Sequence, residues 1–256
     1  MAGRTALVTG AGSGIGRAFA QALARGGHDL VLLDVDPRGL DATAEELRAE
    51  HASVATARAD VADRAALEAA LGESLGHEGR LDLVVTCAAI LGAGRFASQS
   101  SDEFERVLRI DFLGTANTIR AALPALRRAR GQIVVLASTA AVHGWPGLAA
   151  YSAAKFAVVG YVEALRPELA VDGVGLTVVF PLLIDTPLLG GKDIPPILRR
   201  GRRLPPEAVV RKALRGAARR QRRVYVPGTV RVVAALHGLV PSLLDWYGAR
   251  FGLERR

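Results

Sequence analysis

A regular alternation of short apolar runs and longer helical patterns constrains the fold of this chain most strongly. The pattern predicts strands at residues 6–8, 30–33, 52–59 and 81–87, and helices that end at Arg25 or extend over 38–50 and 63–76. Repeated β-α units form a parallel sheet covered by helices on both faces, with ligands at the carboxyl ends of the strands. With 256 residues, 50% of them hydrophobic, the chain can bury the core of such a sheet, and we expect one α/β domain over residues 1–256.

The connection between the first strand and the first helix is rich in glycine, with the sequence Thr9-Gly10-Ala-Gly12-Ser-Gly14-Ile-Gly16. Glycines let the backbone approach a phosphate closely, and the start of the following helix supplies amide donors and the positive end of a dipole. The turn therefore predicts a site for a nucleotide pyrophosphate. The general dinucleotide pattern G-x-G-x-x-G fails, because Ile15 occupies its last glycine position counted from Gly10. A purely structural turn is the alternative.

An aspartate, Asp34, ends the second strand. A carboxylate at that point can accept hydrogen bonds from a ribose 2′-hydroxyl and would repel a 2′-phosphate. We therefore expect NAD as the preferred cofactor. NADP remains an alternative cofactor because of Arg17 and Arg38, since a nearby arginine can accommodate the 2′-phosphate.

Tyr151 and Lys155 stand four positions apart, so a helix would place them on one face. A free tyrosine has a pKa of about 10, and a neighbouring positive charge favours the phenolate and lowers that pKa. The pair predicts a phenol that can exchange protons near neutral pH. An ordinary surface helix would show the same spacing. However, only three of the 33 basic residues are lysines, so a lysine here indicates a need for a compact ammonium group.

Composition also limits the cellular setting. The single cysteine, Cys87, can form neither an intrachain disulfide nor a cysteine metal cluster, which fits a reducing compartment, and we expect no metal. No secretion signal is visible, and no apolar run reaches the length of about eighteen residues that a membrane-spanning helix needs. We expect a cytoplasmic protein that is at most peripheral to a membrane.

Several further residues fall at distinctive spacings. They are Asp60-Val61 after the third strand, and Ser138, which ends the strand at 132–136 and lies thirteen positions before Tyr151. With the glycine turn, Asp34 and Tyr151-x-x-x-Lys155, they resemble the short-chain dehydrogenase/reductase family over residues 4–187. The resemblance implies a Rossmann-type three-layer α/β fold, a doubly wound parallel sheet of about seven strands in the order 3-2-1-4-5-6-7.

The resemblance also implies a set of site residues. Tyr151 would be the acid/base, Lys155 would hold the nicotinamide ribose and lower the pKa of Tyr151, and Ser138 would hydrogen-bond the substrate oxygen. The expected catalytic residues are Ser138, Tyr151, Lys155 and Asp111. The expected cofactor-binding residues are Gly10, Ser13, Gly14, Ile15, Gly16, Asp34, Asp60, Val61, Ala88, Tyr151, Lys155, Pro181, Ile184 and Thr186. Family members commonly associate through helices corresponding to residues 149–172 and 103–128, which implies a homodimer or homotetramer.

Three positions depart from the family pattern. Residues 86–89, Thr-Cys-Ala-Ala, replace Asn-Asn-Ala-Gly, so the asparagine that braces the central strand is missing. Asp111 stands where a catalytic asparagine normally holds a water between the lysine and solvent. Its negative charge would favour the ammonium of Lys155 but partly cancel the pull on the Tyr151 proton, so we expect slow turnover or a raised pH optimum. Leu182 replaces a glycine and must avoid a glycine-only backbone conformation.

Residues 187–204 combine Gly and Pro with apolar side chains and predict a loop with a short helix, a lid over the substrate. The apolar side of this segment predicts a bulky hydrophobic substrate such as a steroid, a lipid or a polyketide-like molecule. His143 and Trp145 lie in the loop before Tyr151, which lines the substrate pocket in the family. A wall or surface residue is the favoured interpretation of His143, and a second catalytic base is the alternative.

Positive charge is concentrated at residues 192–223, which contain twelve Lys or Arg against two carboxylates, whereas the whole chain carries +8. A solvated basic face on a helix at 205–220 is the simplest interpretation. Anionic groups of a substrate, such as acyl-CoA phosphates, or an anionic membrane surface are functional alternatives. Nucleic acid is the weakest of the alternative partners, since no aromatic residues for base stacking are interleaved with the arginines at 199–223. The apolar extension at 228–256 predicts two short helices that cap the pocket, pair with another subunit or lie on a bilayer.

These features lead to one functional expectation, an NAD-preferring oxidoreductase that interconverts a secondary alcohol and a ketone. The alternative is a non-redox, lyase-like enzyme or a cofactor-sensing binder on the same fold, which the altered positions 86, 111 and 182 keep open.

Overall fold

A parallel sheet forms the centre of the computed structural model, which describes residues 3–76, 79–190, 201–240, 242 and 246–247. Within these residues, seven strands pair side by side in the order β3-β2-β1-β4-β5-β6-β7, and each neighbouring pair is parallel. The strands are β1 (Arg4–Thr9), β2 (His28–Asp34), β3 (Val54–Arg58), β4 (Leu83–Thr86), β5 (Gln132–Leu136), β6 (Gly175–Pro181) and β7 (Arg223–Val226). The predicted Rossmann-type fold and strand order are confirmed.

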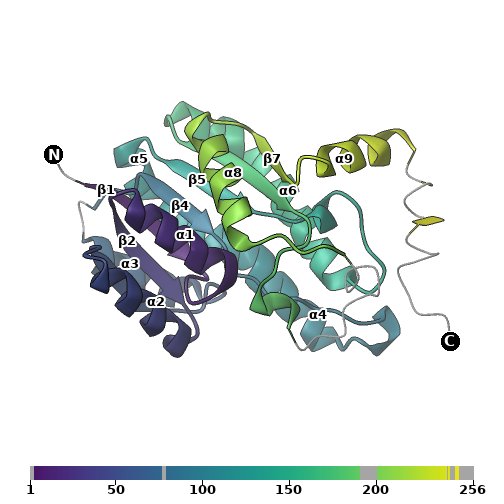
Figure 1. Cartoon of the computed structure of the whole chain (residues 1–256), viewed down its shortest axis with the longest axis horizontal. Coiled ribbons are helices and arrows are strands. Elements are labelled where there is room, and N and C mark those ends of the chain that lie inside the picture. Colours follow the sequence, from purple (N-terminus) through teal and green to yellow (C-terminus); the bar gives the residue numbers. More distant parts are fainter. Residues whose placement is uncertain (1–2, 77–78, 191–200, 241, 243–245, 248–256) are drawn as a thin grey trace.

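Helices connect the strands and cover both faces of the sheet (Figure 1). The α-helices are α1 (Gly14–Arg25), α2 (Pro37–Ala49), α3 (Arg64–Leu75), α4 (Ser101–Val107), α5 (Gly114–Ala129), α6 (Ala149–Val171), α8 (Pro206–Ala218) and α9 (Val230–Leu239). The shorter segments are η1 (Phe96–Ser98), the π-helical η2 (Leu108–Leu113), η3 (Thr139–Ala141) and η4 (Pro187–Leu189). Figure 1 shows α1 and α8 side by side on the near face of the sheet.

Two hydrophobic clusters, one on each face of the sheet, hold the layers together. Leu7 of β1 belongs to the cluster that contains Ile119 of α5 and residues of α3 and α6. Val8 belongs to the other cluster, with Phe19 of α1, Val209 of α8 and residues of α2. Successive side chains of a strand point to opposite faces, so a strand covered on both sides needs a continuous apolar run. This requirement explains why the strands could be predicted from apolar runs in the sequence.

One predicted helix, near residues 103–128, differs in the structure because it consists of α4, the π-helical η2 and α5. The other predicted helices and strands that lie wholly within the described residues agree closely with the observed bounds, as for the helix at 149–172, which is Ala149–Val171. A π-helical turn is a local widening of a helix and is often found at functional sites. Asp111 lies within η2, so the widened turn coincides with a predicted catalytic position.

The C-terminal helix α9 follows the carboxyl end of β7 (Figure 1). The rest of the predicted apolar extension, namely residues 241, 243–245 and 248–256, lies outside the described residues. The same applies to residues 191–200 of the predicted lid and basic segment. Within the described part of the chain, every helix is too short or too polar to cross a membrane.

Candidate active site

The glycine turn after β1 has a backbone that favours glycine. Gly10 and Gly14 have φ angles of +68° and +52°, a region that residues with a Cβ disfavour. A Cβ on Gly16 would lie 1.9 Å from the carbonyl oxygen of Gly10, so the turn closes tightly on itself. Ser13 precedes α1 without a side-chain cap, and the first turn of α1 contains no acidic residue. The amide groups at the start of α1 are therefore left to bind an anion.

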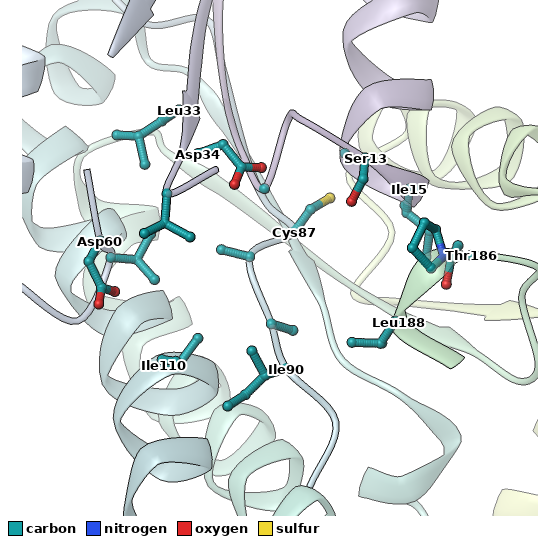
Figure 2. Close-up of a pocket in the computed structure, with 18 of the residues that line it drawn as sticks. Ser13, Ile15, Leu33, Asp34, Asp60, Cys87, Ile90, Ile110, Thr186 and Leu188 are labelled. Carbon is teal, nitrogen blue, oxygen red and sulfur yellow. The ribbon is translucent and has the colours of Figure 1, made fainter. Parts of the chain in front are cut away.

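A cavity of about 320 Å³ lies beside this turn, at the carboxyl ends of the strands. Figure 2 shows Asp34 and Asp60 toward one end of the cavity, Thr186 and Leu188 toward the other, and Cys87 between them. Ten of the fourteen predicted cofactor residues line it, namely Gly10, Ser13, Gly14, Ile15, Gly16, Asp34, Asp60, Val61, Ala88 and Thr186. This edge of a doubly wound sheet is where dinucleotides bind, and the free amides and the glycine cradle fit a nicotinamide dinucleotide.

Asp34 connects the cavity to the glycine turn. Its Oδ2 accepts a hydrogen bond from the Gly12 amide at 2.8 Å, and its Oδ1 accepts one from the Asp36 amide at 3.0 Å. Arg17, one of the two arginines that kept NADP open, forms an ion pair with Glu46 of α2 at 2.5 Å. The hydrogen bond from Arg17 holds the pKa of Glu46 below its ordinary value. The Arg17 guanidinium is thus engaged by a carboxylate of the protein.

A smaller cavity of about 100 Å³ adjoins the first one and contains the predicted catalytic hydroxyl groups. The predicted site residues that line it are Ile15, Ser138, Tyr151, Lys155, Pro181, Ile184 and Thr186. Its remaining walls are mainly apolar and include Leu91, Leu136, Trp145, Leu148, Leu182, Leu183, Leu188 and Leu189. Ile15, Thr186 and Leu188 line both cavities, so the two are continuous. The structure thus brings the predicted cofactor and catalytic residues together at one edge of the sheet.

The predicted catalytic residues of the smaller cavity come from the end of β5 and the start of α6. Ser138 follows β5, and its hydroxyl accepts a hydrogen bond from the Ala140 amide at 3.1 Å. Tyr151 and Lys155 lie one turn apart near the start of α6, with the Lys155 Nζ 5.4 Å from the centre of the Tyr151 ring. Ser138 and Tyr151 both line this cavity, and Ser138 acts to lower the pKa of Tyr151. Tyr151 and Lys155 are only 8% and 3% exposed, so both polar groups are held in a nearly dry environment.

Asp111 lies behind this pair and lines neither cavity. It is fully buried, and its Oδ2 is 3.1 Å from the Nζ of Lys155. Its Oδ1 accepts a hydrogen bond from the Ile90 amide at 2.8 Å, while the Lys155 Nζ also donates to the Leu136 carbonyl at 3.4 Å. One carboxylate oxygen therefore binds the backbone, and the other pairs with the lysine. The aspartate in the family's asparagine position is a direct counter-ion of Lys155.

Burial raises the pKa of Tyr151 above its ordinary value, the charge of Lys155 opposes this rise, and Asp111 adds to it. The net lowering expected from the Tyr-Lys spacing is therefore wrong, because the spacing contains no information on burial. Burial works to lower the pKa of Lys155, but Asp111, Tyr151 and Cys87 together outweigh it and the pKa of Lys155 is raised. Burial raises the pKa of Asp111. At neutral pH the site thus contains a protonated phenol beside a charged ammonium.

Two of the departures from the family pattern are accommodated locally. The hydroxyl of Thr9 accepts hydrogen bonds from the amides of Cys87 at 3.2 Å and Ala88 at 3.3 Å, so the end of β4 is braced from β1. The spacing of the motifs did not reveal this role of Thr9, because the contact joins residues 78 positions apart. Leu182 is absent from the described residues with positive φ, as expected, and its amide donates to the Val226 carbonyl at 2.8 Å.

His143 packs in an aromatic cluster and lines neither of the two cavities. Its ring contacts Trp145, with centroids 5.1 Å apart, and His237 of α9, with centroids 5.2 Å apart. Trp145 itself lines the smaller cavity. His143 therefore supports the cavity wall, as the favoured interpretation held, and α9 lies against the loop that carries this wall.

Oxidation or reduction with a nicotinamide needs a proton donor and acceptor close to the ring. Tyr151 lines the smaller, mainly apolar cavity, which is continuous with the larger cavity that fits the dinucleotide. The fold and this site define a Rossmann-type, nicotinamide-dependent oxidoreductase. The profile of the short chain dehydrogenase family matches residues 4–194. The chain belongs to this family.

Relatives of known sequence support the same assignment. Glycine betaine reductase ATRR of Emericella nidulans is 37% identical over 191 residues, which are 74% of this chain and 15% of that much longer protein. MT0715 of Mycobacterium tuberculosis, named as an uncharacterized NAD-dependent oxidoreductase, is 34% identical over 202 residues, 73% of this chain and 74% of that protein.

Solved structures share the fold over almost the entire chain. A short chain dehydrogenase/reductase from Burkholderia phymatum in complex with NAD has a TM-score of 0.85 and 27% identity, covering 94% of this chain and 95% of that one. A short-chain dehydrogenase from Sphingobium yanoikuyae in complex with NADPH has a TM-score of 0.81 and 30% identity, with the same coverage. The chain is an NAD(P)-dependent oxidoreductase, and both forms of the cofactor occur among its structural neighbours.

Proposed function

We propose that this protein interconverts a secondary alcohol and a ketone on a hydrophobic substrate, with Tyr151 as the proton donor and acceptor. One observation carries the proposal. The Tyr151 and Ser138 side chains line the same mainly apolar cavity, which is continuous with the dinucleotide cavity. A substrate oxygen bound there would meet the two hydroxyl groups within a mainly apolar wall. This arrangement suits a carbonyl or carbinol.

Each polar residue has its own task in this proposal. When bound, the nicotinamide dinucleotide supplies or accepts the hydride. Tyr151 donates a proton to the oxygen of a ketone and takes a proton from an alcohol. Ser138 donates a hydrogen bond to the same oxygen and orients it. Lys155 holds the cofactor ribose and, paired with Asp111, keeps a positive charge beside the phenol.

The protonation state of Tyr151 gives the two directions opposite pH dependences. Because burial raises its pKa, Tyr151 is protonated at neutral pH and is ready to act as an acid toward a ketone. Alcohol oxidation needs the phenolate, so its rate should rise as the pH approaches the raised pKa. This reasoning supports the raised pH optimum expected for the oxidation.

The cavity walls support a hydrophobic substrate such as a steroid, a lipid or a polyketide-like molecule. The enclosed volume of about 100 Å³ has room for the reacting carbon and its nearest substituents. The remainder of a bulky substrate would extend past Leu182, which lines this cavity and is 42% exposed. Apolar walls contribute binding free energy in proportion to the apolar area that they cover.

NAD is the proposed physiological cofactor. Asp34 lines the dinucleotide cavity with a carboxylate that can accept hydrogen bonds from the ribose hydroxyls. The same negative charge would repel a 2′-phosphate, and Arg17 is already paired with Glu46. These contacts support NAD. To bind NADP, the 2′-phosphate would have to lie beside the Asp34 carboxylate, and Arg17 could pair with it only by leaving Glu46.

The substitution Tyr151→Phe tests the mechanism, because it removes only the hydroxyl group. We expect it to abolish turnover, measured as nicotinamide absorbance with a panel of apolar secondary alcohols and ketones, and to leave NADH binding unchanged. Tyr161→Phe is the matched control, since Tyr161 lies on the same helix but contacts Phe112 and lines neither cavity. A fully active Tyr151→Phe enzyme would refute the proposed acid/base. NADH binding by the wild-type protein without turnover of any panel member would favour a cofactor-sensing binder.

A further inference from the structure

A third cavity, of about 620 Å³, lies between α6, β7 and α9, away from the dinucleotide cavity. Its lining residues are Glu163, Arg166, Pro167, Arg222, Arg223, Tyr225 and Arg231. Glu163 follows Tyr151 by twelve residues on the straight run of α6, which at 1.5 Å per residue corresponds to about 18 Å. No residue of this cavity lines the two cavities at the catalytic edge. We call it the arginine cavity.

The arginine cavity has an excess of positive charge. Four guanidinium groups line it against the single carboxylate of Glu163, which already forms an ion pair with Arg223. Among the described residues, no carboxylate forms an ion pair with Arg166, Arg222 or Arg231, although the charge of Glu163 also acts on Arg166. Three cations therefore line one concavity without an ion pair in the described chain.

Arg166 shows that these charges act on one another. Its Nε and Nη2 donate long hydrogen bonds, of 3.5 Å to the Leu176 carbonyl and 3.4 Å to the Arg222 carbonyl, which tie the guanidinium to the neighbouring strands. Burial and the charges of Arg222 and Arg223 lower the pKa of Arg166. A bound anion would relieve this repulsion while the guanidinium stays in place.

The arginines of the arginine cavity are arranged differently from those of an ordinary solvated basic helix face. Arg211 and Arg215 on α8 are exposed, as Arg222, Arg223 and Arg231 are, but they lie on a single helix and line none of the cavities. In the arginine cavity, by contrast, the cationic groups converge from a helix, the sheet edge and a second helix. Convergence of planar guanidinium groups is the arrangement that recognises phosphate oxygens in pairs.

We propose that the arginine cavity binds a phosphomonoester dianion. Inorganic phosphate or a phosphorylated small molecule would satisfy the guanidinium groups directly. A phospholipid headgroup would do the same while Val232 and Leu239, which are exposed and follow Arg231 on α9, enter the apolar layer. The recognised chemistry is the same in both cases, and binding at this site does not depend on turnover.

The test uses the full chain at fixed ionic strength, with two double variants that remove the same charge. R222Q/R231Q lowers the charge of the arginine cavity, and R211Q/R215Q lowers that of α8. Inorganic phosphate is titrated by calorimetry. Binding to phosphatidylcholine vesicles that contain either phosphatidic acid, a phosphomonoester, or phosphatidylserine is measured by co-sedimentation. Thermal denaturation verifies that both variants fold.

We expect R222Q/R231Q to weaken phosphate or phosphatidic acid binding at least about tenfold, because two of the four guanidinium groups that would donate charge-assisted hydrogen bonds are lost. R211Q/R215Q should bind like the wild type. Binding of free phosphate would identify a soluble ligand, and binding of phosphatidic acid vesicles alone would identify a lipid headgroup. Equal losses in both variants, equal binding to phosphatidylserine and phosphatidic acid, or no binding of either probe would each overturn the proposal.

Discussion

Replacing Asp111 by asparagine should lower the pKa of Tyr151 and shift the pH profile of the enzyme to lower pH. The amide side chain of the variant would keep an oxygen for the Ile90 amide but would remove the negative charge 3.1 Å from the Lys155 Nζ. In the wild-type site this charge raises the pKa of Tyr151, while Lys155 lowers it. With the carboxylate gone, the ammonium acts on the phenol unopposed, provided that Lys155 stays protonated.

The size of the shift follows from two distances. Lys155 lies 5.4 Å from the Tyr151 ring centre, where a unit charge contributes about 3 kcal/mol at an effective dielectric constant of about 20. The Asp111 Oδ2 lies 3.1 Å from the same nitrogen and so at most about 8.5 Å from the ring centre, where its opposing contribution is still about 2 kcal/mol. Since one pKa unit corresponds to about 1.4 kcal/mol, we expect the pKa of Tyr151 to fall by about one unit.

The assay compares the pH dependence of kcat/KM for wild type, Asp111→Asn and Glu105→Gln. Glu105 is an exposed residue of α4, and its substitution makes the same change in net charge. In the oxidation direction the rising limb should move to lower pH in Asp111→Asn alone. A near-ultraviolet titration of tyrosinate, with Tyr151→Phe as the blank, measures the same shift without a substrate. A profile that stays in place, or that moves to higher pH, would refute the electrostatic reasoning.

Two further substitutions probe the cofactor cavity and the brace between the central strands. Asp34→Asn keeps an oxygen for the Gly12 amide but removes the charge that repels a 2′-phosphate, so NADPH affinity should rise about tenfold relative to NADH in fluorescence titrations. Unchanged discrimination would show that another group selects the cofactor. Thr9→Val leaves the buried amides of Cys87 and Ala88 without their acceptor and should reduce the free energy of unfolding in urea by about 2 kcal/mol. Thr9→Ser should retain most of the stability, and equal losses in the two variants would contradict the role of the hydroxyl.

The sequence contained the information for the local elements and for the position of the site, because both depend on short-range patterns. Buried strands such as β5 are continuous apolar runs, and Tyr151 and Lys155 are brought together by the helical repeat alone. The strand order came from the family resemblance, since periodicity does not specify which strands become neighbours. Contacts between distant residues were not predictable in this way. Examples are the brace from Thr9 to Cys87 and the approach of His237 to His143.

The direction of the Tyr151 pKa shift shows most clearly why the rest of the site needed the structure. The sequence places a cation near a phenol, and Coulomb's law then predicts a lowered pKa. The same fold that brings the two groups together also removes water from both and places the Asp111 carboxylate beside the cation. Desolvation and the carboxylate both act against the cation, and together they raise the pKa. The Asp111 carboxylate in η2 therefore raises the pKa of the phenol, and the π-helical turn that contains it belongs to the proposed proton-transfer site although Asp111 itself lines neither cavity.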